Sequence, residues 1–458
     1  MKALHHGLGA LALAAACMQA LGGDLQTAFD AAMLHDPTYR AARAELASSL
    51  QNLPIARAGL RPSLSLSFSD NKVEGSRTID NPPLAPVTQA LDYRSPTQSL
   101  NLRAPLYNRE AAKKIDLALA QEIYALTLLR VRQAELADRL GKAWLDCVLA
   151  RHGLAAARIQ VEAVNAQSSA ATRRLALGEG TRPEVADAAS ALETARVQVS
   201  EAQSALDLAT LALRQITGSE SGPVPSGGPG NPPSPAFSAL PESPASLLSR
   251  AEAASPALAL RRFAVQAADV AVERARSGHY PRLDLVASLT KASNESLSTV
   301  NQSSTQQSIG LQLNVPLYSG GAVSAAVTQA LADRTRAEAE VAAEQQTLER
   351  DVTRLFYMAR LGSAKAAAQQ NTFDAAKLSL EAAQKGLAAG LSTQLEIAQA
   401  RRKLAQTAQE QAQSAQELLL ARLRLDLRVG EEPALSLARL EDALSASLLA
   451  ALPTEIRP

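Results

Sequence analysis

Large aromatic side chains are scarce in this chain. It has 458 residues with only 6 Phe, 7 Tyr and 1 Trp, so 3% of the residues are aromatic although 47% are hydrophobic. Globular cores normally bury much of their area with aromatic rings. The apolar share rests here on Ala and Leu, and such a composition, with Glu, Gln, Arg and Lys, is typical of long helices. The scarcity of aromatics therefore argues against thick-cored globular domains.

An excess of one charge and long apolar runs are also missing. The 46 Lys and Arg residues nearly balance the 45 Asp and Glu residues. This balance excludes a nucleic-acid binder that relies on a basic surface. The mean hydropathy is −0.07, and no long apolar stretch follows the N-terminus. These two features exclude a polytopic helical membrane protein.

Residue patterns that carry catalysis are not found. The 5 His are scattered, and none has a metal-ligand spacing with carboxylates nearby. A phosphate-binding glycine loop is also missing, so energy for any transport must come from a partner. We predict that the chain is not an enzyme and needs no cofactor or metal. Cys147 lies amid helical periodicity, which favours a small core residue.

Residues 1–22 are predicted to be a secretory signal peptide. Lys2 gives a weakly positive start, an apolar core runs from Leu8 to Ala16, and small residues follow near Ala20. Export would place the protein in the cell envelope. Cys17 follows three Ala residues, which leaves lipidation of this cysteine open as an alternative.

The chain is built from two copies of one unit of roughly 210 residues. Three pairs of segments match in order: 61–66 with 280–285, 100–107 with 311–318, and 213–218 with 425–430. We place the first repeat at 23–217, a Gly/Pro-rich linker at 218–244, the second repeat at 245–430 and a C-terminal tail at 431–458.

Each repeat is predicted to contain helices and one β-hairpin. A helix over about 25–58 precedes strands of about 8–10 residues, because Leu64, Leu66 and Phe68 alternate with Ser. The hairpins are expected at about 63–105 and 282–315. Long helices over about 109–178 and 322–389 follow, and shorter helices over 183–217 and 395–428 complete the units.

These lengths predict a rod with strands at one end. The long helix would span on the order of 100 Å, about twice each of the shorter helices. Four strands per chain cannot close a barrel around a pore, so several chains must share one sheet. The alternative is a soluble, half-buried sheet at the end of a helical rod.

The duplicated motifs resemble the TolC family of outer-membrane channels, and specifically a protein-secretion member of the CyaE type. The resemblance rests on Pro-x-Leu-x-Leu at Pro62 and Pro281, the segment 315–321, and Leu-Arg-Gln-Ile-Thr-Gly at 213–218. The resemblance implies a mainly α fold with a small β part: a trimer with a 12-stranded transmembrane barrel and a long periplasmic α-helical barrel. The linker and tail would lie in the equatorial region of that helical barrel.

The candidate site consists of the two places where a new helix begins after a glycine-containing turn, which we call the helix restarts. Thr181 and Thr393 are each followed three residues later by an acid, Glu184 and Glu396. This spacing predicts a capping box. The family resemblance implies a second role, because the family closes its periplasmic aperture with acids here, and a trimer would form acidic rings that attract cations.

Further positions of the aperture follow from the same resemblance. Asp187 lies one turn beyond Glu184, whereas its counterpart Gln399 departs from the family's acid. Leu387 and Ser392 stand where the best-known members carry Tyr and Arg links. Aromatic residues at the membrane interface are expected near strand ends. They are Phe68, Tyr107 and Tyr318.

The function that the resemblance implies is the exit duct of a type I secretion system for a protein such as a toxin. The implied partners are a periplasmic adaptor, an inner-membrane ABC transporter and outer-membrane lipid, with no nucleic acid. The outlet of a multidrug or metal efflux pump is an alternative. A third hypothesis is a periplasmic coiled-coil adaptor. An adaptor would carry one helical hairpin between β-rich halves, whereas this chain is predicted to have two helical units that each carry a β-hairpin.

Overall fold

The computed structural model describes residues 24–80, 85–218, 243–294 and 302–449. The predicted signal peptide with Cys17, most of the predicted linker and the end of the tail lie outside these ranges. The chain divides into two compact units. Unit 1 comprises Met1–Ala44, Thr127–Ala259 and Ala342–Pro458, and unit 2 comprises Glu45–Leu126 and Leu260–Val341. We describe each unit by itself.

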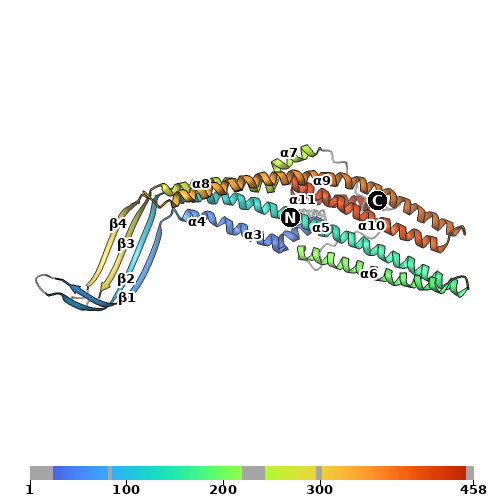
Figure 1. Ribbon diagram of the computed structural model, residues 1–458, viewed down its shortest axis with the longest axis horizontal. Coiled ribbons are helices and arrows are strands. Elements are labelled where there is room, and N and C mark those ends of the chain that lie inside the picture. Colours follow the sequence, from blue (N-terminus) through green and yellow to red (C-terminus); the bar gives the residue numbers. More distant parts are fainter. Residues whose placement is uncertain (1–23, 81–84, 219–242, 295–301, 450–458) are drawn as a thin grey trace, which may run out of the picture. The chain divides into compact units, whose positions relative to one another are not determined.

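Unit 2 contains an antiparallel sheet of four strands in the order β1-β2-β3-β4 (Figure 1). The strands are β1 (Ser63–Ile79), β2 (Val87–Asn108), β3 (Arg282–Asn294) and β4 (Gln302–Asn314). The predicted length of about 8–10 residues is wrong, since the strands have 17, 22, 13 and 13 residues. Residues 70–79 pair with 87–96 without apolar alternation. Backbone pairing continues there where the side-chain pattern gives no indication of a strand.

Helices flank the sheet in the chain. Those wholly or partly in unit 2 are α3 (Pro37–Leu50), α4 (Asn52–Ala58), α5 (Arg109–Ala176), α8 (Pro256–Arg276) and α9 (Ala322–Ala388). The other helices belong to unit 1: α2 (Asp24–His35), α6 (Arg182–Thr217), α7 (Pro244–Ala254), α10 (Gln394–Val429) and α11 (Pro433–Leu449). Within the described residues, no helix has the length and apolar character needed to cross a membrane.

The single helix predicted over 25–58 is wrong, because the chain breaks it into α2, α3 and α4. The first break falls at Asp36, directly before Pro37, whose ring disfavours helical geometry at the preceding residue and whose nitrogen has no proton. The second break falls at Gln51, before Pro54. A matching break at Ser255 precedes Pro256 and separates α7 from α8.

The main core of unit 1 forms around α2. Leu25, Phe29 and Ala32 are fully buried there against Leu136, Leu140 and Trp144 of α5 and against residues of α10 and α11. Most of the buried side chains are Ala and Leu. Helices can approach closely where side chains are small. Gly141 of α5 is such a point, since a Cβ there would lie 2.3 Å from Leu423 Cδ2 of α10.

Candidate functional site

One face of the sheet is apolar and exposed. The register pairs Leu66 with Leu100 and Leu285 with Leu311, so apolar side chains lie side by side across strands. The members of this apolar face include Leu64, Leu66, Phe68, Leu100, Leu102, Leu285, Leu289, Ile309, Leu311 and Leu313. Leu66 is 76% exposed and Ile309 77%. A surface this apolar and this open requires an apolar environment or a partner.

The opposite face of the sheet is polar. Ser67 Oγ lies 2.6 Å from Ser99 Oγ, and an equivalent serine pair joins β3 and β4. Arg103 donates from Nε and Nη2 to Asp284 Oδ2, at 3.1 Å and 2.5 Å. Apolar and polar side chains thus alternate along consecutive strands, which gives the sheet one apolar and one polar face. This is the pattern of transmembrane β-strands.

The sheet has two open edges. In the order β1-β2-β3-β4, strands β1 and β4 each pair on one side only within the described chain. Unpaired edge groups invite pairing with another strand, and natural proteins cover or close such edges. The sheet therefore offers two edges that a second copy of the chain could complete.

The three predicted interface aromatics are exposed, at different distances from the strand ends. Tyr107 is the residue before the last of β2 and Tyr318 follows β4, with exposures of 45% and 89%. Phe68 is 67% exposed on the apolar face. Its expected place near a strand end is wrong, because β1 continues to Ile79.

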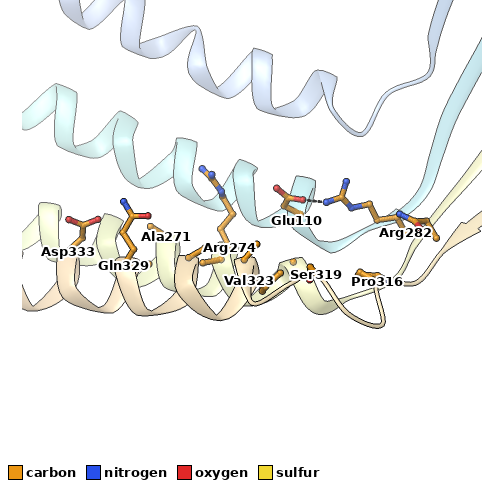
Figure 2. Close-up of a pocket in the computed structure, with 15 residues that line it drawn as sticks. Glu110, Ala271, Arg274, Arg282, Pro316, Ser319, Val323, Gln329 and Asp333 are labelled. Atoms are coloured by element: carbon orange, nitrogen blue, oxygen red, sulfur yellow. Dashed lines mark hydrogen bonds and ion pairs between the residues drawn. The ribbon is translucent and has the colours of Figure 1, made fainter.

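A groove lies where the helices of unit 2 meet the sheet. Its lining includes Arg274 and Ala275 of α8, Ala322 and Gln329 of α9, and Glu110 of α5. Figure 2 shows Glu110, Arg274 and Arg282 along this groove, with the ion pair between Glu110 and Arg282 drawn as a dashed line. The Arg274 guanidinium has no ion pair among the described residues.

The first helix restart is a complete capping box in unit 1. Thr181 Oγ1 accepts a hydrogen bond from the Glu184 backbone N–H at 3.5 Å, and the Thr181 N–H donates to Glu184 Oε2 at 3.3 Å. Arg174 Nη2 also donates to Glu184 Oε2, at 3.0 Å. Sequence reasoning missed Arg174. The only indication in the sequence that Arg174 would contact the capping glutamate was its positive charge in the last turn of α5.

The second restart has the same capping box but lacks the arginine that contacts the capping glutamate of the first. Thr393 and Glu396 exchange hydrogen bonds of 3.2 Å and 3.1 Å at the start of α10. The counterpart of Arg174 is Gly386, and among the described residues Glu396 has no ion pair like the one between Arg174 and Glu184. Both carboxylates are exposed.

The remaining aperture candidates lie beside these caps. Asp187 on α6 and Gln399 on α10 are exposed, each about one turn after the capping glutamate. Within the described ranges, no hydrogen bond or ion pair joins the two restarts. In the same ranges, no group of three or more His, Cys, Asp or Glu is arranged to hold a metal.

The family model for outer membrane efflux proteins matches residues 28–219 and 247–431. The chain belongs to the outer membrane efflux protein family. This result confirms the resemblance drawn from the duplicated motifs. It also confirms an outer-membrane location with a large periplasmic part.

Two relatives resemble this chain in sequence, and one solved structure resembles it in fold. The proteases secretion protein PrtF of Dickeya chrysanthemi is 30% identical over 409 residues, covering 86% of this chain and 84% of PrtF. The alkaline protease secretion protein AprF of Pseudomonas aeruginosa is 29% identical over 376 residues, covering 81% and 77%. The CmeC outer membrane channel of Campylobacter jejuni has a TM-score of 0.71 at 14% identity, covering 95% of this chain and 91% of CmeC.

Proposed function

We propose that three copies of this chain form a channel in the outer membrane, with each copy giving four strands to a 12-stranded barrel. The amphipathic sheet carries this proposal. Its apolar face would contact lipid, its polar face would line water, and β1 of one copy would pair with β4 of the next. Three copies would thereby remove both open edges.

The channel acts as the exit duct of a type I secretion system for a protein substrate. The relatives PrtF and AprF are named for the secretion of proteases, which favours a secreted enzyme or toxin as cargo. The sequence contains no nucleotide-binding loop, so an inner-membrane ABC transporter supplies the energy and a periplasmic adaptor links the two. Outer-membrane lipid surrounds the barrel, and no nucleic acid is involved.

A second candidate is the outlet of a multidrug or metal efflux pump. The family description itself names efflux, and a polar duct would serve either cargo. The adaptor reading fits less well, because the exposed apolar sheet would have no purpose in a soluble adaptor.

Deleting the gene distinguishes these functions. We expect at least one extracellular protein to disappear from the culture medium, with drug and metal tolerance unchanged, because the duct serves a dedicated transporter. Mass spectrometry of the medium and growth inhibition assays measure the two effects. Lost tolerance with an intact set of extracellular proteins would contradict secretion and favour efflux.

We further propose that the capping acids form rings at the periplasmic aperture. In a trimer, Glu184, Asp187 and Glu396 would each occur three times around one axis. The Glu396 ring keeps its full charge, whereas Arg174 partly neutralises Glu184. Glu396 is therefore the stronger attractor for a multivalent cation.

Neutralising the two glutamates should weaken block of the channel by multivalent cations. We expect Glu184→Gln with Glu396→Gln to raise the blocking concentration at least about fivefold, since one unit charge close to a cation is worth about 1 kcal/mol even in water. Of the single variants, Glu396→Gln should have the larger effect. Conductance in planar bilayers with a trivalent cation measures the block.

A charge-adding variant is the control for the aperture. Gln399→Glu restores the acid that the first restart has in Asp187, and it should strengthen block. Unchanged block in the double glutamine variant would remove the proposed rings and leave the two glutamates as helix caps.

A further inference from the structure

All four connections between the sheet and the helices lie at one end of the sheet. Strands β1 and β3 begin there, and β2 and β4 end there, because neighbouring strands are antiparallel. Helices α4 and α8 therefore end, and α5 and α9 begin, at this same end (Figure 1). Residues distant in sequence form one belt around the base of the sheet.

This belt is strongly basic. We define it as residues 51–62, 109–116, 269–282 and 315–329, within about two helical turns of the sheet. Its basic members are Arg57, Arg61, Arg109, Lys113, Lys114, Arg274, Arg276 and Arg282, and its acids are Glu110, Asp116, Asp269 and Glu273. Since the whole chain has a net charge of only +1, this excess is local. We call these eight basic side chains the basic collar.

Every acid of the belt is already paired. Glu110 pairs with Arg282, Asp116 with Lys113 at 3.0 Å, and Glu273 with Arg276 at 3.0 Å. Asp269 pairs outside the collar, with Arg334 at 2.8 Å. Among the described residues, five collar members thus have no acidic partner: Arg57, Arg61, Arg109, Lys114 and Arg274. Their charge is available to an anion from outside the chain.

Apolar and aromatic side chains lie exposed in and beside the same belt. Leu317 is 93% exposed and Tyr318 89%, and they lie three and four residues after the end of β4 at Asn314, while Leu106 and Tyr107 are exposed at the end of β2. Arg109 stacks over the Tyr280 ring, 4.1 Å from its centroid. Aromatic and basic residues together at the border of an apolar surface are typical of a membrane–water interface.

The described part of the opposite end of the sheet has no such excess. Among the described residues of that end, the charged side chains are Lys72, Arg77, Arg94 and Lys291 against Asp70, Glu74, Asp80 and Asp92. Lys72 lies within ion-pair distance of both Glu74 and Asp92. The basic excess is therefore a property of the helix end of the sheet and not of the sheet as a whole.

We infer that the basic collar binds the headgroups of anionic phospholipids in the periplasmic leaflet of the outer membrane. The inference rests on the proposed barrel, which sets the helix end of the sheet at that leaflet. Anionic headgroups complement the unpaired arginines, and each Lys or Arg near such a surface contributes about 1 kcal/mol, or about fivefold in affinity. The collar fixes the depth of the barrel in the membrane and selects its neighbouring lipids.

Native mass spectrometry of the purified full-length trimer tests this inference. The delipidated trimer is offered an equimolar mixture of phosphatidylglycerol and phosphatidylethanolamine in neutral detergent. We expect the wild type to retain phosphatidylglycerol with at least about a tenfold preference, which falls as salt is raised. The combined variant Arg57→Gln, Arg61→Gln, Lys114→Gln and Arg274→Gln should reduce the preference to below about threefold.

Two controls separate charge at the collar from other effects. Lys72→Gln, Arg77→Gln, Arg94→Gln and Lys291→Gln remove the same number of charges at the other end of the sheet and should keep the preference. Arg57→Lys, Arg61→Lys and Arg274→Lys keep the charge and should also keep it. Equal losses in the collar variant and the far-end variant would overturn the inference.

The experiment distinguishes a failure of the proposed barrel from a failure of the collar inference. A chain that forms no trimer contradicts the barrel and the collar inference together. A trimer that conducts in bilayers but holds both lipids equally contradicts the collar inference alone.

Discussion

Replacing Ile309 with arginine is expected to abolish accumulation of the channel in the outer membrane. Ile309 is 77% exposed on the apolar face of β4, opposite Ala287. An arginine on the lipid-facing side of a barrel costs about 2–4 kcal/mol near the middle of the bilayer. In a trimer this cost is incurred three times in one assembly. Fractionation of the cell envelope and the yield of trimer that resists detergent measure the outcome.

The neighbouring residue gives a matched control. Ser308 lies on the polar face, where its hydroxyl is 2.8 Å from that of Ser288. Ser308→Arg adds the same side chain one position away, on the side proposed to face water. It should accumulate like the wild type and alter only conductance. If both variants accumulate equally, the exposed apolar face does not contact lipid.

The faces of the sheet were predictable because side-chain spacing encodes them directly. Leu64 and Leu66 alternate with serine, and the register places them opposite Leu102 and Leu100. The outer halves of β1 and β2 were not predictable, since their pairing depends on backbone hydrogen bonds and their side chains show no apolar period. The capping boxes followed from threonine and glutamate three residues apart, which is a purely local contact.

Contacts that depend on the three-dimensional fold could not be predicted from the sequence. The Arg174–Glu184 pair spans only 10 residues, yet it depends on the fold of the short turn between α5 and α6, in which Gly178 adopts a positive φ of 79°. The basic collar is spread over four separate segments, and only the strand order brings them to one end. Arg139 likewise pairs with Asp36 across a large separation in the chain. Such pairs depend on packing, which no local pattern reports.

Asp36 holds the break between α2 and α3 through a dense set of hydrogen bonds. Its buried carboxylate accepts from both terminal nitrogens of Arg139, at 2.9 Å and 3.0 Å, from the Tyr39 N–H at 2.7 Å, and from the Thr38 hydroxyl. Burial raises the pKa of this carboxyl, but the hydrogen bonds and the Arg139 charge outweigh it and lower the pKa to about 2. The folded state therefore strongly favours the charged form.

Asp36→Asn should destabilise the folded protein by about 2 kcal/mol at neutral pH, because the pKa falls by nearly two units on folding. The folded pKa lies below the unfolded value of 3.8. The contribution is therefore complete well above pH 4 and is lost as the pH falls toward 2. Denaturant titrations of the detergent-solubilised protein, followed by helical circular dichroism at several pH values, measure both effects.

The exposed Asp30 on α2 provides the comparison. Asp30→Asn removes the same charge from the same region without breaking this set of hydrogen bonds, and it should change stability by less than about 0.5 kcal/mol. The two variants should differ most at neutral pH and converge as the pH falls to about 2 and below, because a pKa of about 2 means that half of the Asp36 carboxyls are protonated at pH 2 in the folded wild type. A stability deficit of Asp36→Asn that persists undiminished at pH 2 would mean that the carboxylate charge is not what stabilises the break.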